Sequence, residues 1–308
     1  MEDEIIESYL KAGKAVAKAH KLAKLVTRPG SKFLDIATLC EGEILKQGCE
    51  LGFPINISLD SIAAHYSPEI EDSTVCPDHG LLKIDCGAAL NGYIADAAVT
   101  INLGKDKGVY EDLVNASEVG LAAAIKTAGS GVSVSDIGKE IHKAISKYNV
   151  KPVKNLGGHG LGKYDIHGPP FIPNVSDSRD NFQLEVDKAY AIEPFTTNGY
   201  GAIQQGQVIN IFQFASMKKA KKLSYEKLNL AKKFKAKFNT LPFSPRNVDF
   251  IEGTEKINKT IDDFRKRGIL IGYPIFEEIG RGLVAQTEHS ILVLKDGVHV
   301  YTVEDNDL

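Results

Sequence analysis

The chain has 308 residues, with 37 basic and 40 acidic side chains and a formal net charge of −3 at pH 7. This balance excludes a strong overall field for nucleic acid, and no apolar run approaches the length of a membrane span. The acidic start at residues 1–4 lacks the layout of a secretory signal, and the four cysteines show no close metal-type pairing. We therefore expect a cytoplasmic protein with buried thiols, built as one large α/β domain or as one domain with an insert.

Two amphipathic helices are predicted first, over residues 5–26 and 33–47. Short strands are then expected at 53–58 and 62–66. His65 ends the small apolar run of the second strand. A lone histidine at such a place is most often a hydrogen-bonded core or rim residue, so the local sequence alone assigns His65 no function.

A hairpin over residues 82–100 organises the chain. Asn91-Gly92 between two apolar, β-prone runs is the strongest short signal for a two-residue turn. That turn pairs Gly87 with Asp96 and places Asp85 on the same face of the sheet. The two carboxylates are then diagonal neighbours, roughly 7–8 Å apart in the backbone. Two interpretations stay open here: a half-solvated sheet face, or a divalent cation site.

Helices are predicted over 108–128 and 134–148. The segment 157–162 then surrounds one histidine, His159, with four glycines. We expect a tight strand-to-loop transition that presents the imidazole in open space, which favours a functional site. A second histidine, His167, precedes a rigid Gly-Pro-Pro turn.

Two further carboxylates stand on apolar strands. Glu193 lies at the end of the strand 189–195, where Pro194 prevents a central ladder from continuing. Glu288 lies in the middle of the strand 283–294, a position that a core strand would not give to a carboxylate without need. Both therefore join the list of candidate site residues.

The segment between these strands differs from the rest of the chain in composition. It has a lysine-dense stretch over 218–237, helical from about 224, a second helix over 255–267, and a hairpin-like piece over 269–279. We predict a catalytic domain from 1–212 and 276–308, with an inserted helical subdomain at 213–275. A lysine run is most often a solvated helix face, and a docking surface for nucleic acid or a ribosome is the alternative.

The polar residues in apolar surroundings form one set: Asp85, Asp96, His159, Glu193 and Glu288. Four carboxylates and one imidazole suit Mn, Fe, Co or Zn, and differ from a thiolate structural zinc site. The four negative charges offset two divalent cations, which in such pairs lie roughly 3.5–4 Å apart.

The surroundings of these residues are similar to type II methionine aminopeptidases, the archaeal and eukaryotic class of peptidase family M24. The matching pieces are NIS at 56–58, AAHY at 63–66, DCG at 85–87, NGYIAD at 91–96, GHG at 158–160, IHG at 166–168, IEPF at 192–195 and QTEH at 286–289. The resemblance spans essentially the whole chain, and no ligand position departs from the pattern. The ligand set alone is shared with prolidase and aminopeptidase P, whereas the insert points to type II.

The resemblance implies an α/β (α+β) "pita-bread" fold: a pseudo-twofold antiparallel sheet with helices on its outer face and a small, winged-helix-like helical insert. It implies two divalent metal ions. Asp96 and Glu288 would bridge the two ions. Asp85 would complete the coordination of one ion, and His159 and Glu193 would complete the coordination of the other.

The implied reaction is removal of the initiator methionine from nascent chains, by attack of a metal-bridging water or hydroxide on the first peptide carbonyl. Glu193 would shuttle the proton. His65 would contact the substrate or leaving group, and His167 would hold the carbonyl or the oxyanion. Phe53 and Ile166 resemble parts of the methionine side-chain pocket.

Two alternatives remain: an Xaa-Pro exopeptidase of the same fold, and a non-enzymatic relative that binds RNA or the ribosome through the lysine-rich insert. The expected partners are the N-termini of nascent polypeptides, together with a transient ribosome contact through the insert. We expect a monomer with no membrane association.

Overall fold

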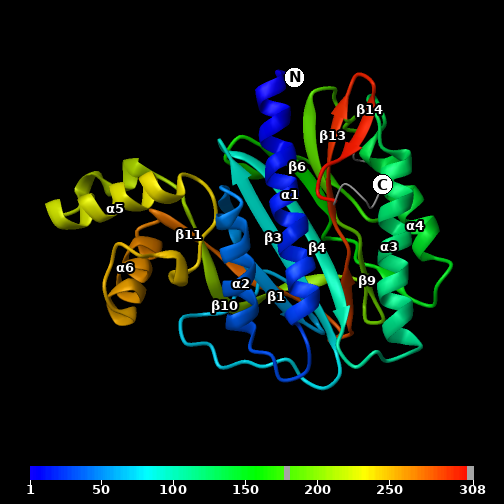
Figure 1. Ribbon diagram of the computed structural model, residues 1–308, viewed down its shortest axis with the longest axis horizontal. Coiled ribbons are helices and arrows are strands. Elements are labelled where there is room, and N and C mark those ends of the chain that lie inside the picture. The colour runs from blue at the N-terminus through cyan, green and yellow to red at the C-terminus, as the bar shows by residue number, and fades with distance from the viewer. Residues whose placement is uncertain (177–180, 304–308) are drawn as a thin grey trace.

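The computed structural model describes residues 1–176 and 181–303. Its N-terminal half is a three-stranded antiparallel sheet in the order β1-β3-β4. The strands are β1 (Glu50–Leu59), β3 (Leu81–Leu90) and β4 (Tyr93–Asn102), and the covering helices are α1 (Asp3–Val26) and α2 (Phe33–Lys46). Both helices bury an apolar stripe on one face of this sheet, in a core that includes Val16, Ile36 and Ile84 (Figure 1).

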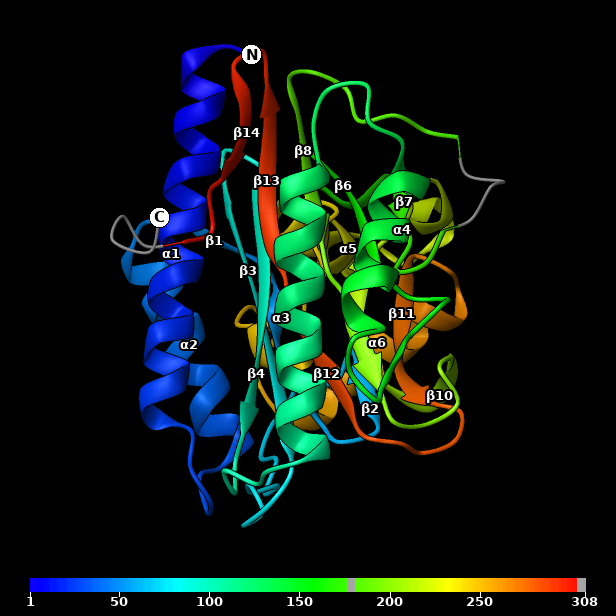
Figure 2. The same ribbon diagram turned by 90° about the vertical axis from the view of Figure 1, so that its right-hand side faces the viewer.

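The C-terminal half repeats this plan around a five-stranded sheet in the order β14-β13-β8-β6-β7. Its strands are β6 (Gly158–Gly162), β7 (Asp165–Ile172), β8 (Lys188–Ile192), β13 (His289–Leu294) and β14 (Gly297–Val300). The helices α3 (Val109–Thr127) and α4 (Val134–Ile145) cover it, and Ile137 and Ile141 of α4 share a core with Ile192 and Ile291. Figure 2 shows the two helix pairs on the outside of the two sheets.

The two halves meet where β4 runs beside β13. The Asp96 amide donates to the Ser290 hydroxyl (2.9 Å), and that hydroxyl donates to the Asp96 carbonyl (2.6 Å). An isolated bridge also pairs Ala98 with Glu288. Two helix-covered antiparallel halves joined at their centre confirm the predicted fold class.

Two small sheets complete the architecture. Their strands are β5 (Lys151–Pro152), β9 (Phe195–Thr197) and β12 (Val284–Gln286), and β2 (Ile62–Ala64), β10 (Ile203–Phe214) and β11 (Leu270–Glu278). Between β10 and β11 lie the 3-10 turn η1 (Met217–Lys222), α5 (Tyr225–Phe238), the 3-10 turn η2 (Pro245–Asn247) and α6 (Thr254–Lys266). This part has an apolar cluster of its own, centred on Phe234, and lies at the left in Figure 1. The strands β10 and β11 pair along their length and lead into it.

Four local predictions were wrong. The glycine-rich segment around His159 is the strand β6 inside a sheet, and His167 lies within the neighbouring strand β7 and does not precede a turn. Glycines are needed there because the backbones approach closely: a Cβ on Gly158 would lie 2.2 Å from the Ala191 carbonyl oxygen. The segment 269–279 is one strand, β11, because β10 supplies its partner.

The fourth error concerns the strand 283–294. It is interrupted at 287–288, so Glu288 lies between β12 and β13 and not in mid-strand. The prediction of buried thiols agrees with the structure, in which all four cysteines are buried and free. In the described part of the chain, no helix combines the length and apolar character needed to cross a membrane.

Candidate metal centre

The hairpin β3–β4 has the predicted register. Gly87 pairs with Asp96, and Asp85 pairs with Ala98. The turn residues Asn91 (φ +54°) and Gly92 (φ +84°) both have the left-handed backbone that a tight hairpin requires. Both aspartates therefore point to the same side of the sheet, toward the centre of the molecule.

The other two carboxylates lie at matching interruptions of two adjacent strands. Ile192, the last residue of β8, pairs with His289, and Phe195, the first of β9, pairs with Gln286. Glu193 and Glu288 occupy the two gaps between these pairs, where the backbone ladder stops. The Glu288 amide donates instead to the Ala98 carbonyl at 3.0 Å, which brings it beside the hairpin.

The five predicted ligands converge. Ligand atoms of Asp96, His159 and Glu288 all lie within 4.8 Å of one another. Nε2 of His159 lies 3.7 Å from Asp96 Oδ2 and 3.8 Å from Glu193 Oε1. Asp85 belongs to the group as well, because its charge raises the pKa values of Asp96 and Glu193.

The sequence analysis did not single out Gln286. Its Nε2 donates to Glu193 Oε2 (3.1 Å) and to Glu288 Oε2 (3.2 Å), so one buried amide holds both carboxylates. A signal was available: Gln286 is polar, ends an apolar strand, and precedes Glu288 by two residues.

The site fits divalent cations because its charges lack compensation within the protein. Asp85 Oδ1, Asp96 Oδ1 and Glu288 Oε1 are buried oxygen atoms with no hydrogen-bond partner. Desolvation raises the pKa of Asp85 to about 7. Desolvation and mutual repulsion raise the pKa values of Asp96 and Glu288 well above their usual range.

Two further groups have shifted pKa values. Desolvation, together with repulsion from Asp85, raises the pKa of Glu193 well above its usual range. Desolvation lowers the pKa of His159, which keeps the imidazole neutral, as a metal ligand requires. Without a cation the carboxyls hold protons, and a bound cation would replace those protons.

A cavity of about 560 Å³ opens onto this cluster. The four residues expected to contact the substrate all line it: Phe53, His65, Ile166 and His167. The rings of His65 and His167 lie 6.2 Å apart, and His167 lies 4.8 Å from His159.

The His65 backbone is held in the left-handed region, at φ +68°. Desolvation, with His167 nearby, lowers the pKa of His65 to about 3, so its ring is neutral. Tyr273 and Phe276 of β11 also line the cavity, next to His65, and the sequence analysis did not find them.

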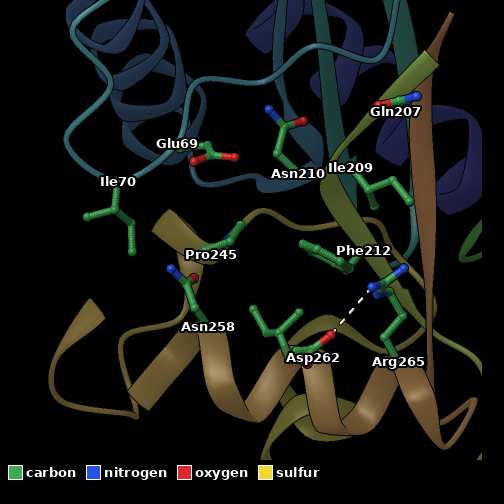
Figure 3. Close-up of a pocket in the computed structure, with 11 residues that line it drawn as sticks. Glu69, Ile70, Gln207, Ile209, Asn210, Phe212, Pro245, Asn258, Asp262 and Arg265 are labelled. Carbon is green, nitrogen blue, oxygen red and sulfur yellow. Dashed lines mark hydrogen bonds and ion pairs between the residues drawn. The ribbon is translucent and has the colours of Figure 1, made fainter. Parts of the chain in front are cut away.

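A second cavity, of about 340 Å³, lies between α6 and the second half of β10 (Figure 3). Its charged lining includes Glu69 and an ion pair of Asp262 with Arg265 at 3.4 Å. The Asp262 charge is balanced by Arg265 and by Lys266, at 2.6 Å. None of the predicted site residues lines this cavity, so we place the functional site in the first one.

Comparisons with known proteins agree with this geometry. The model of metallopeptidase family M24 matches residues 7–219. The methionine aminopeptidase of Saccharolobus solfataricus is 38% identical over 303 residues, covering 98% of this chain and 99% of the relative. That of Methanocaldococcus jannaschii is 35% identical, covering 98% and 100%.

Solved structures share the fold. A thermophilic Arx1 superposes with a TM-score of 0.83 at 16% identity, over 99% of this chain and 92% of its own. The methionine aminopeptidase of Thermotoga maritima superposes with a TM-score of 0.72 at 21% identity, over 99% and 98%. By sequence, fold and site, the chain belongs to metallopeptidase family M24 and, within it, to the type II methionine aminopeptidases.

Proposed function

We propose that this protein is a metal-dependent hydrolase that removes the N-terminal methionine from nascent proteins and peptides. The observation that carries the proposal is the convergence of four carboxylates and a neutral imidazole at the base of a largely apolar cavity. The full-length relatives named methionine aminopeptidase support it, and they do not favour an Xaa-Pro exopeptidase or a non-enzymatic binding protein.

The five ligands would hold two divalent cations, of Co, Mn, Fe or Zn type. Asp96 and Glu288 are central in the cluster and suit the bridging positions. Asp85 suits one ion, and His159 with Glu193 suits the other. When bound, the ions supply Lewis acidity toward the first peptide carbonyl and activate water at neutral pH.

The protein's own groups position the substrate and move protons. Glu193, held by Gln286 and 3.8 Å from His159, is the candidate to accept and return a proton. Neutral His65 and His167 face the same cavity and can donate hydrogen bonds to a carbonyl oxygen or leaving group. Phe53 and Ile166 are buried and supply apolar contact for the methionine side chain.

The direct test is release of methionine from a Met-Ala-Ser peptide by protein supplied with Co²⁺ or Mn²⁺. Asp96→Ala should abolish release. An Xaa-Pro peptide serves as the competing substrate. Faster cleavage of that peptide, or unchanged turnover by Asp96→Ala, would refute the assignment.

A second proposal concerns residues 213–275, which we propose form an inserted helical subdomain that contacts the ribosome. Its helix α5 projects from the body of the molecule (Figure 1), and Lys232 and Lys233 are exposed on it. Exposed Lys218 and Lys219 precede it on η1. Basic groups grouped in this way suit phosphate backbones.

Co-sedimentation with ribosomes at low and high salt tests this contact. Replacing Lys218, Lys219, Lys232 and Lys233 by glutamate should abolish the association and leave peptide hydrolysis unchanged. Unchanged association would exclude the contact. A cytoplasmic location and a monomeric state remain predictions.

A further inference from the structure

One wall of the cavity at the metal centre is formed by a tyrosine of β11. Tyr273 lines this cavity, and its ring meets the ring of His65 edge-on, with the centroids 5.6 Å apart and an interplanar angle of 90°. The same ring lies 5.8 Å from the ring of His167. Because Tyr273 packs against both histidines expected to contact the substrate, its position limits how far their rings can move.

The hydroxyl group of Tyr273 is bound by a residue of the neighbouring strand β10. Gln213 pairs with Ile271, two residues before Tyr273, so Gln213 and Tyr273 are diagonal neighbours on the same face of the sheet. The Tyr273 hydroxyl donates a hydrogen bond to Oε1 of Gln213 at 2.8 Å. The phenol is therefore anchored at the end of the ring that is furthest from its own backbone.

A second hydrogen bond determines the orientation of the Gln213 amide. Its Nε2 donates to the backbone carbonyl of Thr240 at 2.5 Å, and a carbonyl can only accept. Oε1 is therefore the atom turned toward Tyr273, and the phenol is the donor. Since the hydroxyl proton of Tyr273 is directed at Gln213, the tyrosine presents its ring to the cavity and not a hydrogen-bond donor.

Thr240 is in turn anchored to the tip of the hairpin β3–β4. Its hydroxyl donates to the Tyr164 carbonyl at 2.5 Å, and the Tyr164 amide donates to the Gly92 carbonyl at 2.7 Å. A Cβ on Gly92 would lie 2.4 Å from Cε2 of Tyr164, so the Tyr164 ring packs directly against the hairpin turn. Gln213 thus connects a cavity side chain to a segment that the N-terminal half holds in place.

We propose that Gln213 is a positioning residue that holds the ring of Tyr273 against the two cavity histidines. This inference rests on the proposed function, because it presupposes that these histidines act on a bound substrate. Gln213 is not one of the described residues that line the cavity, so its effect on the reaction passes through Tyr273.

The test is a double-mutant cycle of Gln213→Leu and Tyr273→Phe, assayed with a Met-Ala-Ser peptide and Mn²⁺. Each single substitution removes the hydrogen bond, so each should lower kcat about three- to tenfold, the range that one hydrogen bond supports. KM should change by less than about twofold, because the apolar wall of Phe53 and Ile166 is untouched. In the Tyr273→Phe protein, Gln213→Leu should cause no further loss of kcat.

Gln205→Leu is the matched control. Gln205 lies on the same strand and also pairs with β11, but it is exposed and is not among the described residues that line the cavity. This variant should keep the kcat of the wild type. Urea unfolding of every variant measures the folded fraction, so that a loss of folded protein is not counted as a loss of kcat.

A crystal structure of Gln213→Leu gives a readout that does not depend on activity. We expect the Tyr273 ring to leave its edge-on contact with His65, and a ring that stays in place would overturn the proposal. An equal loss of kcat from Gln213→Leu with and without the Tyr273 hydroxyl would also overturn it, and would assign Gln213 to the Thr240 contact alone. A wild type that hydrolyses no peptide would instead refute the proposed function, and the crystal structure would still decide the positioning role.

Discussion

The ring of Phe53 lies directly against the backbone of Gly87. A Cβ atom placed on Gly87 would come 2.2 Å from Cε1 of Phe53 and 2.3 Å from Cδ1. Such contacts are impossible, so the absent side chain of Gly87 makes room for this wall of the cavity. Gly87 also stands opposite Asp96, which ties the shape of the apolar wall to the carboxylate cluster.

Gly87→Ala should therefore displace Phe53 and impair the enzyme. We expect kcat/KM for a Met-Ala-Ser peptide to fall at least tenfold, and the free energy of unfolding to fall by about 1–3 kcal/mol, as overpacking usually causes. Urea unfolding and initial rates measure the two effects. Gly42→Ala in α2 is the control, because its Cβ would meet nothing within 4 Å. Full activity in Gly87→Ala would show that Phe53 is free to move.

Asp96→Asn should separate stability from metal binding. Removing a carboxyl that must take up a proton to stay buried should raise the melting temperature of the metal-free protein by a few degrees. The same change should remove the stabilisation by added Mn²⁺, which for the wild type amounts to about 2.7 kcal/mol at 100 times Kd. Calorimetric scans with EDTA and with Mn²⁺ provide both numbers. A lower melting temperature of the metal-free variant would contradict the charge argument.

A buried ion pair fastens the insert to the N-terminal half. The Arg246 guanidinium donates to both Glu41 oxygens, at 2.8 and 3.0 Å, and both side chains are at most 10% exposed. Its remaining groups donate to the Pro68 carbonyl and the Ser67 hydroxyl, shortly after His65. The pair thus also holds the segment that carries this histidine.

Arg246→Met should reduce the free energy of unfolding by about 3–5 kcal/mol, because it leaves the Glu41 charge buried and unpaired. Glu41→Gln combined with Arg246→Met should recover part of that loss. Arg265→Met, which breaks an exposed pair, should cost less than about 1 kcal/mol. Chemical denaturation measures the free energies of unfolding. Equal losses in Arg246→Met and Arg265→Met would contradict a larger contribution from the buried Arg246–Glu41 pair.

Lys83 gives the protein a stability that depends on pH. It is 1% exposed, and desolvation lowers its pKa to about 7 from an ordinary 10.5. Between these values the unfolded chain binds a proton that the folded chain does not. The free energy of unfolding should therefore rise with pH over this window, by up to about 1.4 kcal/mol per unit.

Lys83→Met should flatten that rise between pH 7 and 10, as measured by urea unfolding at several pH values. Lys139→Met, on the exposed side of α4, should keep the slope of the wild type. A slope that persists in Lys83→Met would assign the effect to another group.

The sequence predicted those parts of the site that depend on local pairing. The turn at Asn91-Gly92 determines the register of β3 and β4, and this prediction was confirmed residue by residue. The polar residues within apolar strands also proved informative, because burial makes each of them costly without a shared ligand. Their individual roles stay predictions.

The remainder depended on contacts between distant segments. The glycines around His159 favour a loop in isolation, and only the neighbouring strands β7 and β8 make that segment a sheet strand. The bulge between Phe53 and Asn56 changes the pairing of β1 with β3. Pro54 marks an irregularity there, but only the partner strand determines the shifted register. The gap at Glu288 likewise arises because β12 and β13 pair with different strands.

The carboxylates come from both halves of the molecule: Asp85 and Asp96 from the hairpin, Glu193 and Glu288 from the strand gaps opposite. A cation held between them acts as a cross-link between the two halves, each of which has its own hydrophobic core. With it, the halves are expected to melt as one unit. Without it, the carboxyls must take up protons to stay buried, which weakens the seam between the halves, so protease sensitivity along this seam should report how fully the centre is loaded.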